Sequence, residues 1–162
     1  MRTSRLYRRL VFDERIATDV FAVQNSREMM GYAQITATAA PGHTLAQLER
    51  VILEEIARLA ADGPTDEEIE RGRVQAEAQF MFRLQTVGGF GGKSDQLNAY
   101  NVFLKDPGYF PKDLARYQAC TKSSLQAVVN RYFDPGRRVT LSIVPHDRAS
   151  LAAPDSTTAA VS

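Results

Sequence analysis

Residues 16–25 read IATDVFAVQN and residues 30–39 read MGYAQITATA, and these two stretches decide the fold. Both are rich in β-branched and aromatic residues, and polar and apolar positions alternate along them as they do in strands. Only a short polar stretch that begins at Asn25 separates the two. Antiparallel strands need no more than such a turn, whereas parallel strands need a long crossover. We therefore predict an antiparallel pair of strands at residues 16–25 and 30–39.

Helical patterns lie on both sides of this pair. Residues 5–14 predict a helix whose Leu6 and Leu10 share one face. After the second strand, Thr44 and Gln47 have the spacing of a capping box, in which two side chains bond the free backbone groups of a helix start. Apolar residues then recur at helical spacing as far as Gly63, a residue type typical of helix ends. We expect a long amphipathic helix there.

The rest of the chain predicts more helices and one further strand. A second capping box begins at Thr65 and opens a helix that runs to about Thr86, followed by a glycine-rich break at residues 88–92. We expect helices at 94–104, 112–118 and 123–133, and a last strand at 137–145, where Val139, Leu141 and Ile143 alternate. The fold class is therefore α+β, a small antiparallel sheet packed by several helices. We place one domain at residues 1–146 and a disordered tail at 147–162.

The composition of the chain excludes some classes of protein. The chain has 162 residues, 20 Lys and Arg against 19 Asp and Glu, and a net charge of +1. This balance gives no reason to expect a nucleic-acid partner, and no apolar stretch is long enough to span a membrane. The N-terminal arginines resemble those of a transit peptide, but an exposed basic helix is the simpler interpretation. We find no secretory signal, and the sequence leaves the compartment open, periplasmic or cytoplasmic.

The residues that could bind a metal are few and scattered. The chain has two histidines, His43 and His146, and one cysteine, Cys120. Neither histidine has a second ligand at helical spacing, and no H-x-x-E-H or H-E-x-x-H motif occurs. We therefore assign no catalytic, cofactor-binding or metal-binding residue, and expect the isolated chain to hold no zinc and to cleave no peptide.

Two further patterns have simple structural interpretations. Gly92-Lys93-Ser94 is similar to the end of a phosphate-binding loop, but Val87 stands where that motif needs glycine and a helix precedes it instead of a strand. We interpret residues 88–92 as a hinge between helices. The carboxylates that follow Thr65 are most simply a solvated helix start; they are Glu67, Glu68 and Glu70.

A series of short motifs resembles the M16 family of zinc metallopeptidases, the insulinase and pitrilysin type. The first is Ser4-Arg5-Leu6-Tyr7, which is similar to the family's S-R-L-[FY]-x-x-L segment. The others follow in order: residues 35–42, ITATAAPG; residues 63–69, GPTDEEI; residues 76–80, AEAQF; residues 99–100, AY; residues 106–110, DPGYF; and residues 131–141, RYFDPGRRVTL. Each is weak alone, but their order and spacing extend over residues 4–145.

The resemblance implies a partial M16 domain of the C-terminal, metal-free type, with the LuxS/metallopeptidase-like fold. Members of the family are built as two halves of a hollow clamp, and the zinc lies on a separate catalytic domain. The chain begins at the S-R-L segment, so we expect it to be truncated at its N-terminus. The implied function is a non-catalytic portion of the peptide-enclosing chamber. The implied partners are a catalytic M16 domain or subunit and, through the chamber, a peptide substrate.

One departure from the family pattern concerns catalysis. In many members this domain supplies an arginine and a tyrosine, seven residues apart, to the active site of the partner. The matching positions here are Val11 and Thr18. Valine carries no charge, and threonine has a shorter reach than tyrosine, so we carry over no catalytic residue. Two alternatives stay open: a non-peptidase M16-like scaffold or core subunit of a larger complex, and an unrelated small α+β binding module.

Overall fold

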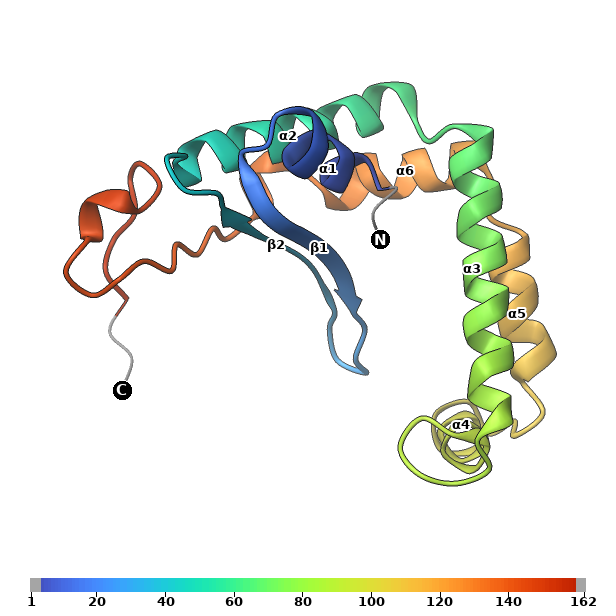
Figure 1. Cartoon of the computed structure of the whole chain (residues 1–162). Coiled ribbons are helices and arrows are strands. Elements are labelled where there is room, and N and C mark those ends of the chain that lie inside the picture. The colour runs from blue at the N-terminus through green and yellow to red at the C-terminus, as the bar shows by residue number, and fades with distance from the viewer. Residues whose placement is uncertain (1–3, 160–162) are drawn as a thin grey trace. The chain divides into compact units, whose positions relative to one another are not determined.

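The computed structural model describes residues 4–159 and has an α+β fold. The chain divides into two compact units (Figure 1). The sheet unit comprises Met1–Arg58 and Tyr132–Ser162, and the helical unit comprises Leu59–Arg131. Each unit is described by itself below.

The two predicted strands are confirmed in the sheet unit. β1 (Ala17–Asn25) and β2 (Tyr32–Ala39) pair antiparallel. The register places Val20 opposite Ala37, and it is irregular between Ala17 and Asp19. Figure 1 shows this hairpin as a ribbon that projects away from α2 (Leu45–Asp62). Most side chains in its outer half are exposed on both faces, so only the base of the hairpin contributes to the core.

The predicted N-terminal helix is present but has an unusual interior. α1 (Arg5–Tyr7) is a single turn, and residues Arg8–Asp13 continue it as a π-helix, η1. The Glu14 amide donates to the Arg9 carbonyl at 2.9 Å, which is the five-residue spacing of a π-helix. Arg15 then adopts a positive φ of 55° and turns the chain into β1.

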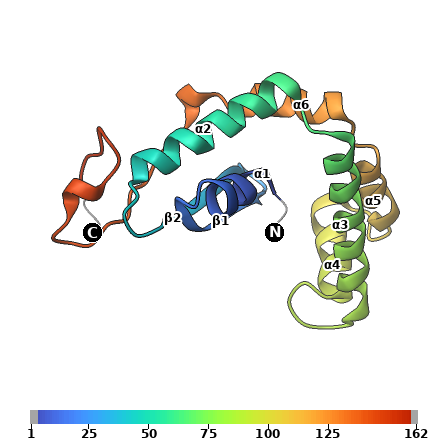
Figure 2. The same ribbon diagram turned by 45° about the horizontal axis from the view of Figure 1, so that its top comes forward.

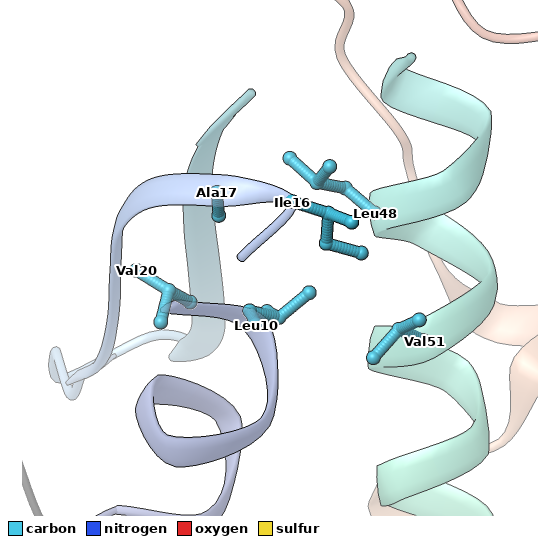
Figure 3. Close-up of a cluster of buried hydrophobic side chains, with 6 residues drawn as sticks. All are labelled: Leu10, Ile16, Ala17, Val20, Leu48 and Val51. Atoms are coloured by element: carbon cyan, nitrogen blue, oxygen red, sulfur yellow. The ribbon is translucent and has the colours of Figure 1, made fainter. Parts of the chain in front are cut away.

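The core of the sheet unit lies between this N-terminal segment, the base of the hairpin and α2. α2 begins with the predicted capping box: the Thr44 amide donates to Gln47 Oε1 at 2.9 Å, and the Gln47 amide donates to Thr44 Oγ1 at 3.2 Å. In Figure 3, side chains from all three elements point toward one another. The buried cluster consists of Leu10, Ile16, Ala17, Val20, Leu48 and Val51.

The helical unit is an arrangement of helices without a strand in its described residues. Its elements are α3 (Asp66–Gln85), α4 (Lys93–Ala99), a π-helix η2 (Tyr100–Leu104), α5 (Phe110–Gln118) and α6 (Lys122–Tyr132), which ends one residue inside the sheet unit. α3 and α5 lie side by side in both views (Figures 1 and 2). The Phe80 ring meets those of Phe110 and Tyr117 edge to face, with centroids 5.4 and 5.3 Å apart. These aromatic contacts join the two helices.

The last predicted strand is wrong. After a short 3-10 turn, η3 (Pro135–Arg137), the chain through residue 145 has no regular structure. The apolar residues of the expected strand are almost fully in solvent: Val139 is 96% exposed, Leu141 74% and Ile143 85%. Their alternation is a true β signal, but a strand forms only when a neighbouring strand completes the ladder. The described sheet has only two strands, β1 and β2, and neither pairs with this segment.

The disordered tail predicted at residues 147–162 stays a prediction. Within it, residues Ala149–Leu151 form a 3-10 turn, η4, and the Ala153 amide donates to Ser142 Oγ at 3.1 Å. Residues 160–162 lie outside the described part of the chain. None of the helices in residues 4–159 combines the length and apolar character that crossing a membrane requires.

Candidate functional site

The segment with the strongest motif, residues 4–18, is the first candidate for a functional site. Val11 lies in η1, where it is half-buried against the core cluster. Thr18 lies in β1, exposed, and its hydroxyl donates to the Thr38 carbonyl at 3.4 Å. Val11 therefore has an aliphatic side chain, and Thr18 has a short side chain with a hydroxyl. Neither could stabilise a developing negative charge as an arginine and a tyrosine would.

The arginine next to these positions is fully engaged. Arg9 donates from Nε to Glu14 at 2.7 Å and from Nη1 to Glu55 at 2.9 Å, and its Nη2 binds Glu54. The hydrogen bonds that Arg9 donates to Glu54 and then to Glu14 hold the Arg9 pKa above its usual value. Hydrogen bonds from Arg9 and then Arg50 hold the Glu54 pKa below its usual value. These bonds join η1 to α2, so Arg9 has a structural role.

The sequence analysis missed this cluster, although one signal was present. Glu55 is a buried carboxylate, 6% exposed, and it also accepts a hydrogen bond from Arg58 at 2.9 Å. It follows Leu48 and Val51 on the apolar face of α2, where a carboxylate is out of place without a partner. That position could have indicated a buried ion pair. The identity of the partner, 46 residues away, could not be inferred from spacing.

The metal-ligand types stay scattered in the structure. His43 and His146 are exposed in loops, and Cys120 is half-buried with its Sγ near the Arg116 carbonyl at 3.6 Å. Among residues 4–159, no three or more His, Cys, Asp or Glu side chains gather in a group that could hold a metal ion. The described residues therefore offer no group of side chains that could bind zinc. The M16 resemblance implies a zinc site on a separate catalytic domain.

The glycine-rich stretch separates α3 from α4 as predicted. The backbone amides from Gly91 to Ser94 already have acceptors. The Gly91 amide donates to the Asp95 carboxylate at 2.9 Å, and those of Lys93 and Ser94 donate to the carbonyls of Thr86 and Val87 at 2.8 and 3.1 Å. A phosphate loop needs free amides that point at the anion, and a carboxylate in that place repels one. This geometry favours a structural turn.

The acidic start of α3 also has a structural role. Glu68 accepts from the Thr65 amide at 2.8 Å, and Thr65 Oγ1 accepts from the Glu68 amide at 3.2 Å, which completes the second capping box. Glu67 lies 3.6 Å from Arg71, one helical turn further on. These carboxylates stabilise the helix end, where the macrodipole favours negative charge.

The segment that holds Val11 and Arg9 also lies in the region that matches a known protein family. Residues 2–75 match the protein family described as "Peptidase M16 inactive domain". The match covers 74 of the 162 residues, just under half of the chain. The matched region covers η1, the hairpin, α2 and the first half of α3, and it includes nearly all of the core of the sheet unit.

A solved structure has the same fold as this chain. It is titled "The crystal structure of a protease from Helicobacter pylori" and superposes with a TM-score of 0.68 over 83% of this chain, at 21% sequence identity. At that identity the likeness shows the fold alone. This chain spans about a third, 32%, of the length of that protease. No curated protein matches the chain.

Proposed function

We propose that this chain is a non-catalytic portion of an M16-type zinc metallopeptidase. In this role it forms part of the wall of the chamber that encloses peptides, and the zinc site lies on another domain or chain. The observation that carries the proposal is the match of residues 2–75 to the M16 inactive domain. An inactive domain in this family implies a catalytic partner domain.

The described side chains support a structural role. Arg9 lies close to Val11 in the sequence, and it binds three carboxylates. The described residues offer no grouped metal ligands. In this proposal the chain affects a peptide only by forming part of the wall around it.

The proposal is tested with the purified chain and a catalytic M16 polypeptide that carries H-x-x-E-H from the same genome. We expect the chain alone to retain no stoichiometric zinc after dialysis, measured by elemental analysis, and to cleave no fluorogenic peptide. The two polypeptides together should cleave faster than the catalytic one alone. A catalytic partner with the motif glutamate replaced by glutamine is the control. About one tightly held zinc per chain, or chelator-sensitive cleavage by the pure chain, would contradict the proposal.

A second candidate is a scaffold subunit without peptidase work. The observation that favours it is the pair Val11 and Thr18, since the half-buried valine carries no charge and the exposed threonine has a shorter reach than a tyrosine. The two candidates differ in a measurable way. A scaffold would bind its M16 partner and leave the rate of peptide cleavage unchanged, whereas a chamber component would raise it.

A further inference from the structure

The turn between β1 and β2 carries two methionines next to each other, Met29 and Met30. Met29 is 97% exposed and Met30 is 76% exposed, so neither has a part in the buried cluster of the sheet unit. The third methionine of the described residues, Met81, lies in α3 and is 45% exposed. Met1 lies outside the described part of the chain. The described methionines therefore differ in their access to solvent, and the two most exposed are neighbours.

The shape of the turn does not depend on the two thioethers. The ladder of the hairpin ends at the pair Asn25 and Tyr32. At Gly31 the backbone approaches the Asn25 carbonyl so closely that an added Cβ would lie 2.7 Å from its oxygen. The turn is thus held by its backbone, and the two methionine side chains extend into solvent. A chemical change at their sulfur atoms should leave the hairpin intact.

Met29 and Met30 also lie beyond the end of the ladder. A further strand in this sheet would pair along the free edge of β1 or of β2, and these strands end and begin at Asn25 and Tyr32. Figure 1 shows the turn at the end of the hairpin that is farthest from α2. The exposure of the two methionines is therefore a property of the turn, and it does not depend on whether further strands complete the sheet.

A methionine thioether that solvent can reach is open to oxidation by a hydroperoxide. A sulfur lone pair attacks one peroxide oxygen, and the S–O bond forms as the O–O bond breaks. The proton of the transferred hydroxyl passes to the departing oxygen, which leaves as water. The sulfur has then lost two electrons, and an apolar side chain has become a polar sulfoxide. Methionine sulfoxide reductases, one for each epimer, reverse the step: two thiols become a disulfide, and the oxygen leaves as water.

We propose that Met29 and Met30 form a reversible oxidation site, at which a hydroperoxide converts the apolar tip of the hairpin into a polar one without a change in fold. Met81 reacts more slowly, because the helical unit covers more than half of its surface. The proposal is independent of the proposed function, because it rests on the chemistry and exposure of the turn alone.

Peptide mapping after timed exposure to hydrogen peroxide tests the site. Trypsin cuts after lysine and arginine, so the two tip methionines lie in the peptide 28–50 and Met81 lies in the peptide 74–83. We expect the peptide 28–50 to gain oxygen about twofold faster per methionine, in the ratio of the exposed fractions. Met29→Leu combined with Met30→Leu should remove this faster reaction, and Met81→Leu, the matched control, should keep it. Equal rates in the two peptides, or a faster reaction at Met81, would overturn the proposal.

A second measurement tests whether the fold stays intact and whether the change is reversible. In a chain with Met81→Leu and Cys120→Ser, the tip methionines are the only sulfur atoms left among the described residues. After complete oxidation, the circular dichroism spectrum and the urea midpoint of this chain should equal those before oxidation. The two epimer-specific reductases with a dithiol should then remove the added oxygen from the peptide 28–50. A lowered urea midpoint, or sulfoxides that the reductases leave in place, would also overturn the proposal.

Discussion

Leu10 is the residue on which the core of the sheet unit most depends. Its side chain is 0% exposed and lies in η1, between the base of the hairpin and α2 (Figure 3). We expect Leu10→Ala to lower the free energy of unfolding of this unit by about 3 kcal/mol. Loss of the transfer energy, at about 0.8 kcal/mol per carbon removed, gives roughly 2.4 kcal/mol. The cavity adds to it, and measured leucine-to-alanine changes in cores lie at about 2–5 kcal/mol.

The same chemical change at an exposed leucine is the control. Leu151 is 47% exposed in η4, so Leu151→Ala leaves no cavity and should cost about 1 kcal/mol or less. Urea unfolding followed by circular dichroism gives the stability of the chain. Hydrogen exchange of the β1 amides reports on the sheet unit in particular, because units of a structure can open separately. A loss of less than 1 kcal/mol for Leu10→Ala, or equal losses for both variants, would refute this account of the core.

Three further predictions concern local features. Burial first, and then the hydrogen bond to Asp113 at 2.8 Å, raise the Tyr100 pKa to about 12, so the free energy of unfolding should fall between about pH 10, the usual tyrosine pKa, and pH 12. Absorbance titration should show one late tyrosine, absent in Tyr100→Phe; a normal titration of all tyrosines would contradict this. Arg15→Gly should raise stability by about 0.5–1 kcal/mol because φ is 55°, whereas Arg8→Gly inside η1 should lower it, as thermal unfolding will show. Inorganic phosphate should leave the amide resonances of residues 88–94 unmoved; a saturable shift would revive a phosphate site.

The elements that the sequence predicted correctly have local signals. The hairpin, α2 and α3 follow from alternation, helical periodicity and two capping boxes, and each of these operates within a few residues. The capping bonds at Thr44 and Thr65 are present as expected. The π-helices were expected only as helices, because the wider turn changes which amide meets which carbonyl without changing the residue types that favour a helix.

The features that the sequence did not predict depend on distant partners. The alternation at Val139, Leu141 and Ile143 indicates a strand, but a local pattern does not identify the strand that would pair with it. The Arg9 cluster joins residues 45 and 46 positions apart, and no spacing rule covers that distance. The candidate site shows the same difference between local signals and distant contacts. The motif identifies Val11 and Thr18 as positions of interest in the sequence, but only the structure shows that Val11 packs against the core cluster.

The residues of the motif that resembles the family therefore stabilise the fold of this chain. Leu6 and Leu10, which are the two leucines of the S-R-L segment, pack in or against the core. Arg9 between them binds Glu14, which follows η1, and two carboxylates of α2. These contacts fix the N-terminal segment against α2. An arginine at position 11 in place of valine would have to leave this packing or bring a charge into it. The match to the M16 inactive domain and the residues at positions 11 and 18 are thus compatible in one segment, because Leu6, Leu10 and Arg9, which fix its packing, are different residues from Val11 and Thr18.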